Sequence, residues 1–192
     1  MKNNLLFDSL IQEALAAGAT RAAIIDAKEL HTDASFREMC AANACGMYGR
    51  CYMCPPDVGE IEDLMRELSR YAHVLVYQRV SPLEDSFDFE GMQVARRTQY
   101  RLSQKIRTTF EDAGVSDALH LSAGGCGVCT TCAKQTNEPC RFPDRAMASL
   151  EVYGIYVSEM ARSAGMKYIN GENTVTYFGA VLFNKEDNDG NT

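Results

Sequence analysis

Cysteines are the residues of this sequence whose type and spacing indicate chemistry, and all 8 of them fall into two clusters. The second cluster consists of Cys126, Cys129, Cys132 and Cys140. Its first three thiols follow the pattern C-x2-C-x2-C, which grips the irons of a cubane cluster together with a further cysteine placed elsewhere. Gly125 and Gly127 carry no side chain, so the backbone can wrap closely around a bound group. The spacing predicts a 4Fe–4S cluster; a structural zinc site, which usually draws on two separated C-x2-C pairs, is the alternative.

The first cluster lies earlier in the chain and consists of Cys40, Cys45, Cys51 and Cys54. Its pattern, C-x4-C-x5-C-x2-C, fits iron–sulfur and zinc ligation about equally. It is closed by Pro55-Pro56, which forbids a helix through the loop and stiffens the exit. In two-cluster ferredoxins one cysteine of a run ligates the other cluster, so Cys54 and Cys140 are candidates to exchange roles. All the cysteines are therefore predicted metal and cofactor ligands.

Other chemistry-bearing residues are less specific. Four cations flank the cysteines: Arg50, Lys134, Arg141 and Arg145. They either balance thiolate charge and raise a reduction potential or are ordinary solvated side chains, and the sequence leaves both interpretations open. No catalytic residue is indicated, because His31, His73 and His120 do not cluster and no nucleophile triad, phosphate loop or dinucleotide fingerprint is present.

Composition restricts the class of protein. A chain of 192 residues with 46% apolar residues is long enough for one domain with a buried core. A net charge of −7 argues against nucleic acid, which needs a positive footprint. The N-terminal residues do not form a signal peptide, and no stretch is apolar enough for a membrane span. We expect a cytoplasmic protein, and in that reducing compartment clustered cysteines favour metal over disulfides.

The elements that must position the cysteines can be predicted from periodicity and from turn residues. Helices are expected over 5–17, 58–71, 89–113 and 145–165, the last with a break near Gly154, together with a helical turn over 34–39 and with Asp57 capping the second helix. Strands are expected over 22–26, 73–80, 117–121 and 174–183. The helix over 89–113 carries the most basic face of the chain, which we expect to be solvated: Arg96, Arg97, Arg101, Lys105 and Arg107.

The order of these elements suggests an internal repeat. Each half, 1–84 and 85–184, reads helix, strand, four cysteines, helix and strand. The predicted fold class is α/β (or α+β), a compact sheet of about four strands flanked by helices, within a single metal-binding domain. The two halves would be pseudo-repeated lobes, each with a four-cysteine metal loop, and residues 185–192 would form a disordered tail.

Several segments also carry a resemblance to a known family. They are Cys45-Gly-Met-Tyr-Gly-Arg-Cys-Tyr-Met-Cys-Pro-Pro, Cys126-x2-Cys-x2-Cys, Pro139-Cys140-Arg141-Phe-Pro, Ser149-Leu-Glu-Val-Tyr-Gly154 and Thr176-Tyr-Phe-Gly179. Over about Cys40 to Leu182, the chain resembles the bacterial and archaeal predicted metal-binding proteins called domain of unknown function 2284. The resemblance implies metal binding, iron–sulfur in kind, and it implies no substrate.

Two functions from different classes follow from these observations. The first is a cytoplasmic iron–sulfur protein with two 4Fe–4S clusters that transfers electrons to a redox partner protein. The second is a non-redox zinc- or iron-binding protein whose structural metal sites support a binding or interaction module. An enzyme that uses a cluster as a Lewis acid needs an open iron, and two full sets of four cysteines leave none.

Overall fold

The computed structural model of the chain describes residues 2–185, so residues 186–192 of the expected tail lie outside the described part. Within it, the helices are α1 (Lys2–Ala17), α2 (Phe36–Ala41), α3 (Ile61–Leu68), α4 (Phe89–Asp112) and α5 (Val157–Ser163). The strands are β1 (Arg21–Asp26), β2 (His73–Pro82), β3 (Ala118–Ser122), β4 (Ala148–Ser149) and β5 (Thr174–Phe183). No helix in 2–185 combines the length and the apolarity needed to cross a membrane.

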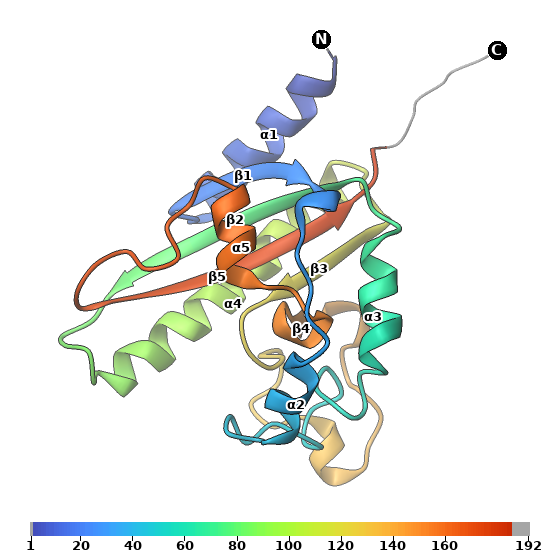
Figure 1. The fold of residues 1–192 in the computed structure, drawn as a ribbon, viewed down its shortest axis with the longest axis vertical. Coiled ribbons are helices and arrows are strands. Elements are labelled where there is room, and N and C mark those ends of the chain that lie inside the picture. Colours follow the sequence, from blue (N-terminus) through green and yellow to red (C-terminus); the bar gives the residue numbers. More distant parts are fainter. Residues whose placement is uncertain (1, 186–192) are drawn as a thin grey trace.

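One sheet contains all of these strands, in the order β1-β2-β5-β3-β4 (Figure 1). Its centre is the antiparallel pair of β2 and β5, which are aligned along their whole length from His73↔Phe183 to Pro82↔Thr174. The expected α/β class with one sheet is confirmed. The strand beyond the predicted four is β4, which pairs with β3 in parallel through only two residues.

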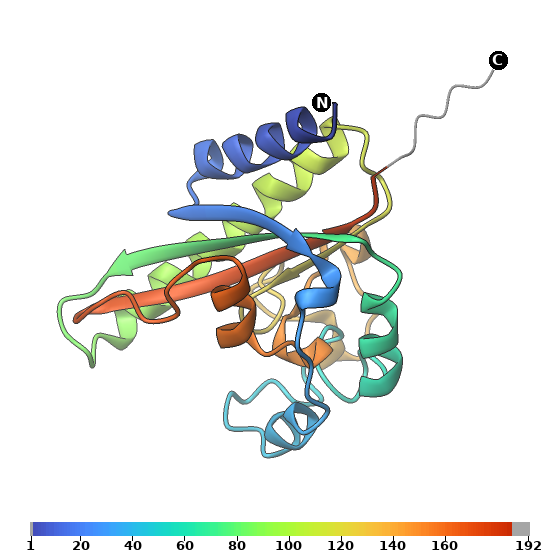
Figure 2. The same cartoon turned by 45° about the horizontal axis from the view of Figure 1, so that its top comes forward.

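The core lies on both faces of this sheet. Along β2, Val74 and Val76 point to one face and Leu75 and Tyr77 to the other, because side chains alternate across a strand. Helices α1 and α4 cover the face of Leu75 and Tyr77, and α3 and α5 lie on the opposite face (Figure 2). The four side chains are at most 1% exposed, so this part of β2 lies in the interior of the protein.

Most predicted elements are present, and two predictions are wrong in their details. The helix expected over 58–71 is limited to α3, and Asp57 does not cap it but forms an ion pair with Lys134. The stretch expected over 145–165 does break at Gly154, as predicted, but its α-helix begins only at Val157. Before it, β4 pairs with β3, and Gly154 adopts a left-handed φ of 72° that ends a short 3-10 turn. Local helical spacing was overridden there by sheet pairing and by the bond from the Asp33 N–H to the Gly154 carbonyl.

The two halves have the same order of elements but are not separate lobes. The first contains α1, β1, α3 and β2, and the second contains α4, β3, α5 and β5, with a cysteine segment after β1 and after β3. Strands of both halves share the sheet, with β2 and β5 adjacent at its centre. Register differs between them, since Ala22 pairs with Tyr77 whereas its sequence counterpart Ala118 pairs with Phe183. A common origin of the halves therefore stays a prediction.

Because Gly179 has no side chain, the Tyr77 ring can lie against its backbone. We expect Gly179→Ala to destabilise the fold by about 1–3 kcal/mol through overpacking. A methyl group there would overlap the Tyr77 ring, whose hydroxyl donates to Ser103 at 2.8 Å. Urea denaturation followed by circular dichroism measures the effect. Adding Tyr77→Leu should recover part of the loss, because leucine frees the space; strictly additive losses would contradict this explanation.

Candidate metal centre

The two cysteine segments lie side by side at the end of the molecule opposite α1 (Figure 1). Three polar contacts hold them together. The Tyr52 hydroxyl donates to the Glu138 carbonyl at 2.7 Å, the Arg50 guanidinium donates to Gln135 at 2.8 Å, and Lys134 pairs with Asp57. Segments separated by more than seventy residues in the sequence thus form one cysteine-rich region.

The second cysteine cluster surrounds a small cavity. All four of its members contribute to the wall: Cys126, Cys129, Cys132 and Cys140. Apolar neighbours such as Val128 and Phe142 complete the wall, and the cavity volume is about 20 Å³. A space of that size holds about one water-sized object. The structure therefore brings together the four thiols that the sequence grouped.

The first cluster is divided. Three of its members, Cys40, Cys45 and Cys54, line a much larger cavity of about 530 Å³, whereas Cys51 does not line it. Polar side chains on the same wall include Gln93, Arg96 and Glu151, from α4 and from the segment after β4. This volume is within the range of small-molecule pockets. The first cavity thus has room for a bound group and for a further ligand beside it.

Cys51 connects the two clusters. It is 1% exposed, and its thiol contacts the thiols of Cys54 and Cys132. The hydrogen bond from Cys54, aided by backbone N–H groups of Met53 and Cys126, lowers the pKa of Cys51 to about 6, against the effect of burial. The same hydrogen bond holds the Cys54 proton and raises the pKa of that thiol. Cys51 is thus a thiol contact between the two clusters, and the exchange of roles between Cys54 and Cys140 stays a prediction.

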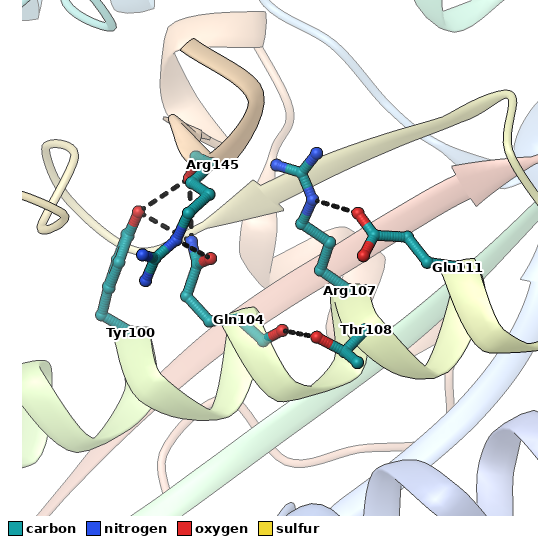
Figure 3. A network of polar contacts seen from close by, with 6 residues as sticks. All are labelled: Tyr100, Gln104, Arg107, Thr108, Glu111 and Arg145. Carbon is teal, nitrogen blue, oxygen red and sulfur yellow. Dashed lines mark hydrogen bonds and ion pairs between the residues drawn. The ribbon is translucent and has the colours of Figure 1, made fainter. Parts of the chain in front are cut away.

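Helix α4 holds the second cysteine segment in place (Figure 3). The Tyr100 hydroxyl donates to the Arg145 carbonyl at 3.1 Å, and the Gln104 amide donates to the same carbonyl at 2.8 Å. The Tyr100 oxygen also lies 3.8 Å from the Cys126 sulfur. Burial raises the pKa of both Tyr100 and Cys126.

The four cations near the cysteines have different surroundings. Arg141 bonds Glu138 at 2.6 Å and also contacts the Cys129 thiol, while the hydrogen bond to Asp57 raises the pKa of Lys134. Arg50 is exposed and bonds Gln135, and Arg145 lies over the Phe142 ring. Arg141 is therefore the arginine of this set that contacts a cysteine thiol.

Donor chemistry and spacing can be compared with what a metal needs. Among residues 2–185, no three cysteine, histidine, aspartate or glutamate side chains converge closely enough to hold a single metal ion. Tetrahedral zinc would draw its sulfurs to about 3.8 Å from one another, given Zn–S bonds of about 2.3 Å. The thiols instead line the walls of the two cavities. An all-thiol donor set selects zinc, copper(I) or iron–sulfur clusters, so the residues fit a soft metal.

Sequence reasoning identified the cysteines but missed the side chains that support them. Tyr100 and Gln104 are four residues apart, which places them on one face of α4. That spacing is visible in the sequence, but their partners Cys126 and Arg145 are not. Arg96 was assigned to a solvated surface, and it lines the first cysteine cavity.

Comparison with known proteins gives one match. The model of a family described as predicted metal-binding protein, DUF2284, covers residues 23–183. The matched range includes both cysteine clusters and every strand after the first two residues of β1. No curated protein and no solved structure matches the chain.

The cysteine segments contain little regular structure, so we expect metal loading to protect them from proteases. Chelator-treated protein should be cut faster than loaded protein between Cys40 and Pro56 and between Gly124 and Pro143. Limited proteolysis with mass spectrometry locates the cuts. The loop over 83–88, which has no cysteine, serves as the internal control and should be cut equally in both forms. Equal resistance of the cysteine segments with and without metal would contradict the prediction.

Proposed function

We propose that this chain, which belongs to the DUF2284 family of predicted metal-binding proteins, is an iron–sulfur protein. It would transfer electrons to a partner protein in the cytoplasm. The observation that supports this most is the position of Cys51, whose thiol contacts a thiol of each cavity wall. Groups bound at the two cavities would then be neighbours. Neighbouring redox centres allow an electron to enter at one and leave at the other.

Iron–sulfur clusters supply reversible one-electron chemistry at potentials set by charge, hydrogen bonds to sulfur and solvent exposure. The chain's own residues provide the charge and the hydrogen bonds. Backbone N–H groups of Met53 and Cys126 donate to the Cys51 sulfur, and Arg141 contacts the Cys129 sulfur. Tyr100 lies against Cys126 from the side of α4. Such donors stabilise a more negative, reduced centre and orient the ligands.

The first cavity supports a cluster by its volume of about 530 Å³ and its three thiols. The second cavity, at about 20 Å³, would have to widen around a cluster. It lies in a segment whose regular structure is limited to the short 3-10 turn Ala133–Thr136. Because metal binding commonly orders such ligand loops, we include a cluster at both cavities in the proposal.

A second candidate function is a non-redox metalloprotein with structural metal sites. The small volume of the second cavity favours it, because that space suits one ion better than a cubane. Anaerobic purification with iron, sulfide and zinc analysis separates the two. A brown protein that bleaches with dithionite supports electron transfer, and a colourless, zinc-loaded protein supports the structural role.

Single cysteine substitutions test how ligands are divided between the cavities. We expect Cys129→Ser to lose the second centre and Cys45→Ser to lose the first, each with about half of the bound iron. Cys51→Ser should weaken both, because its thiol contacts both clusters. Iron per chain is the measurement, and circular dichroism controls for folding. Full iron retention in Cys129→Ser would remove that residue from the ligand set.

The charge of Arg141 should influence the potential of the second centre. We expect Arg141→Gln to lower the reduction potential by roughly tens of millivolts, because the added electron then meets less positive charge. The shift is limited since Arg141 is 46% exposed and paired with Glu138. Arg50→Gln is the control, because it also removes one positive charge but from a side chain that is bonded to Gln135. It should leave the potential unchanged. Potentiometric titration followed by EPR measures both variants, and a centre that cannot be reduced would exclude electron transfer.

A further inference from the structure

A second kind of cavity lies beside the cysteine region, and its walls carry positive charge. Helix α4 contributes Arg96, Arg97 and Arg101, with the Tyr100 ring between them. The loop after β3 forms the opposite wall through Ala123, Gly125 and Gly127. The volume of this arginine cavity is about 150 Å³, enough for a phosphate or a short dicarboxylate. Part of the basic face of α4 therefore lines a cavity.

The charges of the arginine cavity are not neutralised by ion pairs within the described part of the chain. Among residues 2–185, none of its three guanidinium groups lies within ion-pair distance of a carboxylate. On the same helix, Arg107 pairs with Glu111 at 2.9 Å (Figure 3). The Nε of Arg96 is buried without a hydrogen-bond partner, a state that costs about 1–3 kcal/mol for a polar group. An acceptor oxygen from a ligand would remove that cost.

The glycines of the opposite wall allow a close approach. A side-chain carbon at Gly127 would lie 3.0 Å from the Tyr100 ring, and one at Gly125 would lie 3.3 Å from Met47 and 3.6 Å from the Cys54 sulfur. The backbone is therefore pressed between α4 and the first cysteine cluster. The N–H groups of Gly125 and Gly127 donate to no backbone oxygen in the described part of the chain.

We propose that the arginine cavity binds a small dianion, of the class of phosphate or a short dicarboxylate. Guanidinium groups bind carboxylate and phosphate oxygens through paired, charge-assisted hydrogen bonds. Arg96 and Gly125 also line the first cysteine cavity, so the bound anion lies next to that centre. The inference stands without the metal, since none of the residues that form the site is a cysteine.

Isothermal titration calorimetry of the protein as purified, with inorganic phosphate and with malonate at matched ionic strength, tests the proposal. We expect saturable binding of one anion per chain, and whichever probe binds more tightly identifies the source of the dianion. Arg96→Gln should weaken binding at least tenfold, about 1.4 kcal/mol. Arg101→Gln should also weaken anion binding. Because Arg101 is more exposed than Arg96, this variant replaces the first one if Arg96→Gln folds poorly.

Lys105→Gln is the matched control, because it removes a positive charge from α4 at a residue that does not line the cavity. Its affinity should equal that of the unchanged protein. An equal loss in Lys105→Gln would show a general charge effect and overturn the site, as would the absence of saturation with both probes. Neither result depends on the metal content, so the anion site can be disproved while the proposed electron transfer still stands.

Discussion

The pairing of β2 with β5 is the constraint on which the rest of the structure depends. It joins residues about one hundred positions apart, from His73↔Phe183 to Pro82↔Thr174. Antiparallel pairing at the centre of the sheet places β1 and β3 on either side. Each of those strands leads into a cysteine segment, although β1 and β3 run antiparallel to each other and leave the sheet in opposite directions (Figure 1). The sheet fixes where each cysteine segment begins, and contacts between the segments, such as that from Tyr52 to Glu138, hold them together.

Helix α4 then performs two separate tasks along its length. Its buried side packs on the sheet, where Ser103 links Tyr77 to Ser122 through hydrogen bonds of 2.8 Å. Its other contacts face the cysteine region: Tyr100 and Gln104 bind the Arg145 carbonyl, and neighbouring arginines form the wall of a cavity. A rigid helix positions side chains more accurately than a loop does, so redox tuning and anion binding can share one support. The proposed electron transfer and the proposed anion site are therefore physically adjacent.

Local pattern by itself determined much of the frame and the identity of the candidate ligands. Alternating β-branched and aromatic residues predicted β5 with its observed bounds, and helical periodicity with a glycine stop predicted α4 to within one residue. Cysteine spacing indicated a soft metal, in agreement with the predicted metal-binding family that the chain belongs to. These features are readable because strand and helix periods, and short ligand spacings, are set by neighbouring residues.

Only the tertiary structure decided which residues meet across the chain. It placed the Cys51 thiol outside the lining of the first cavity and in contact with Cys132 as well as with Cys54, its neighbour in the sequence. It replaced the first part of a predicted helix with β4, and it took Asp57 from a helix cap to Lys134. Each of these outcomes is a contact between distant segments that outweighs a local preference worth at most about 1 kcal/mol per residue or about 2 for a cap. The sequence determines which groups are present; the shared sheet determines what they touch.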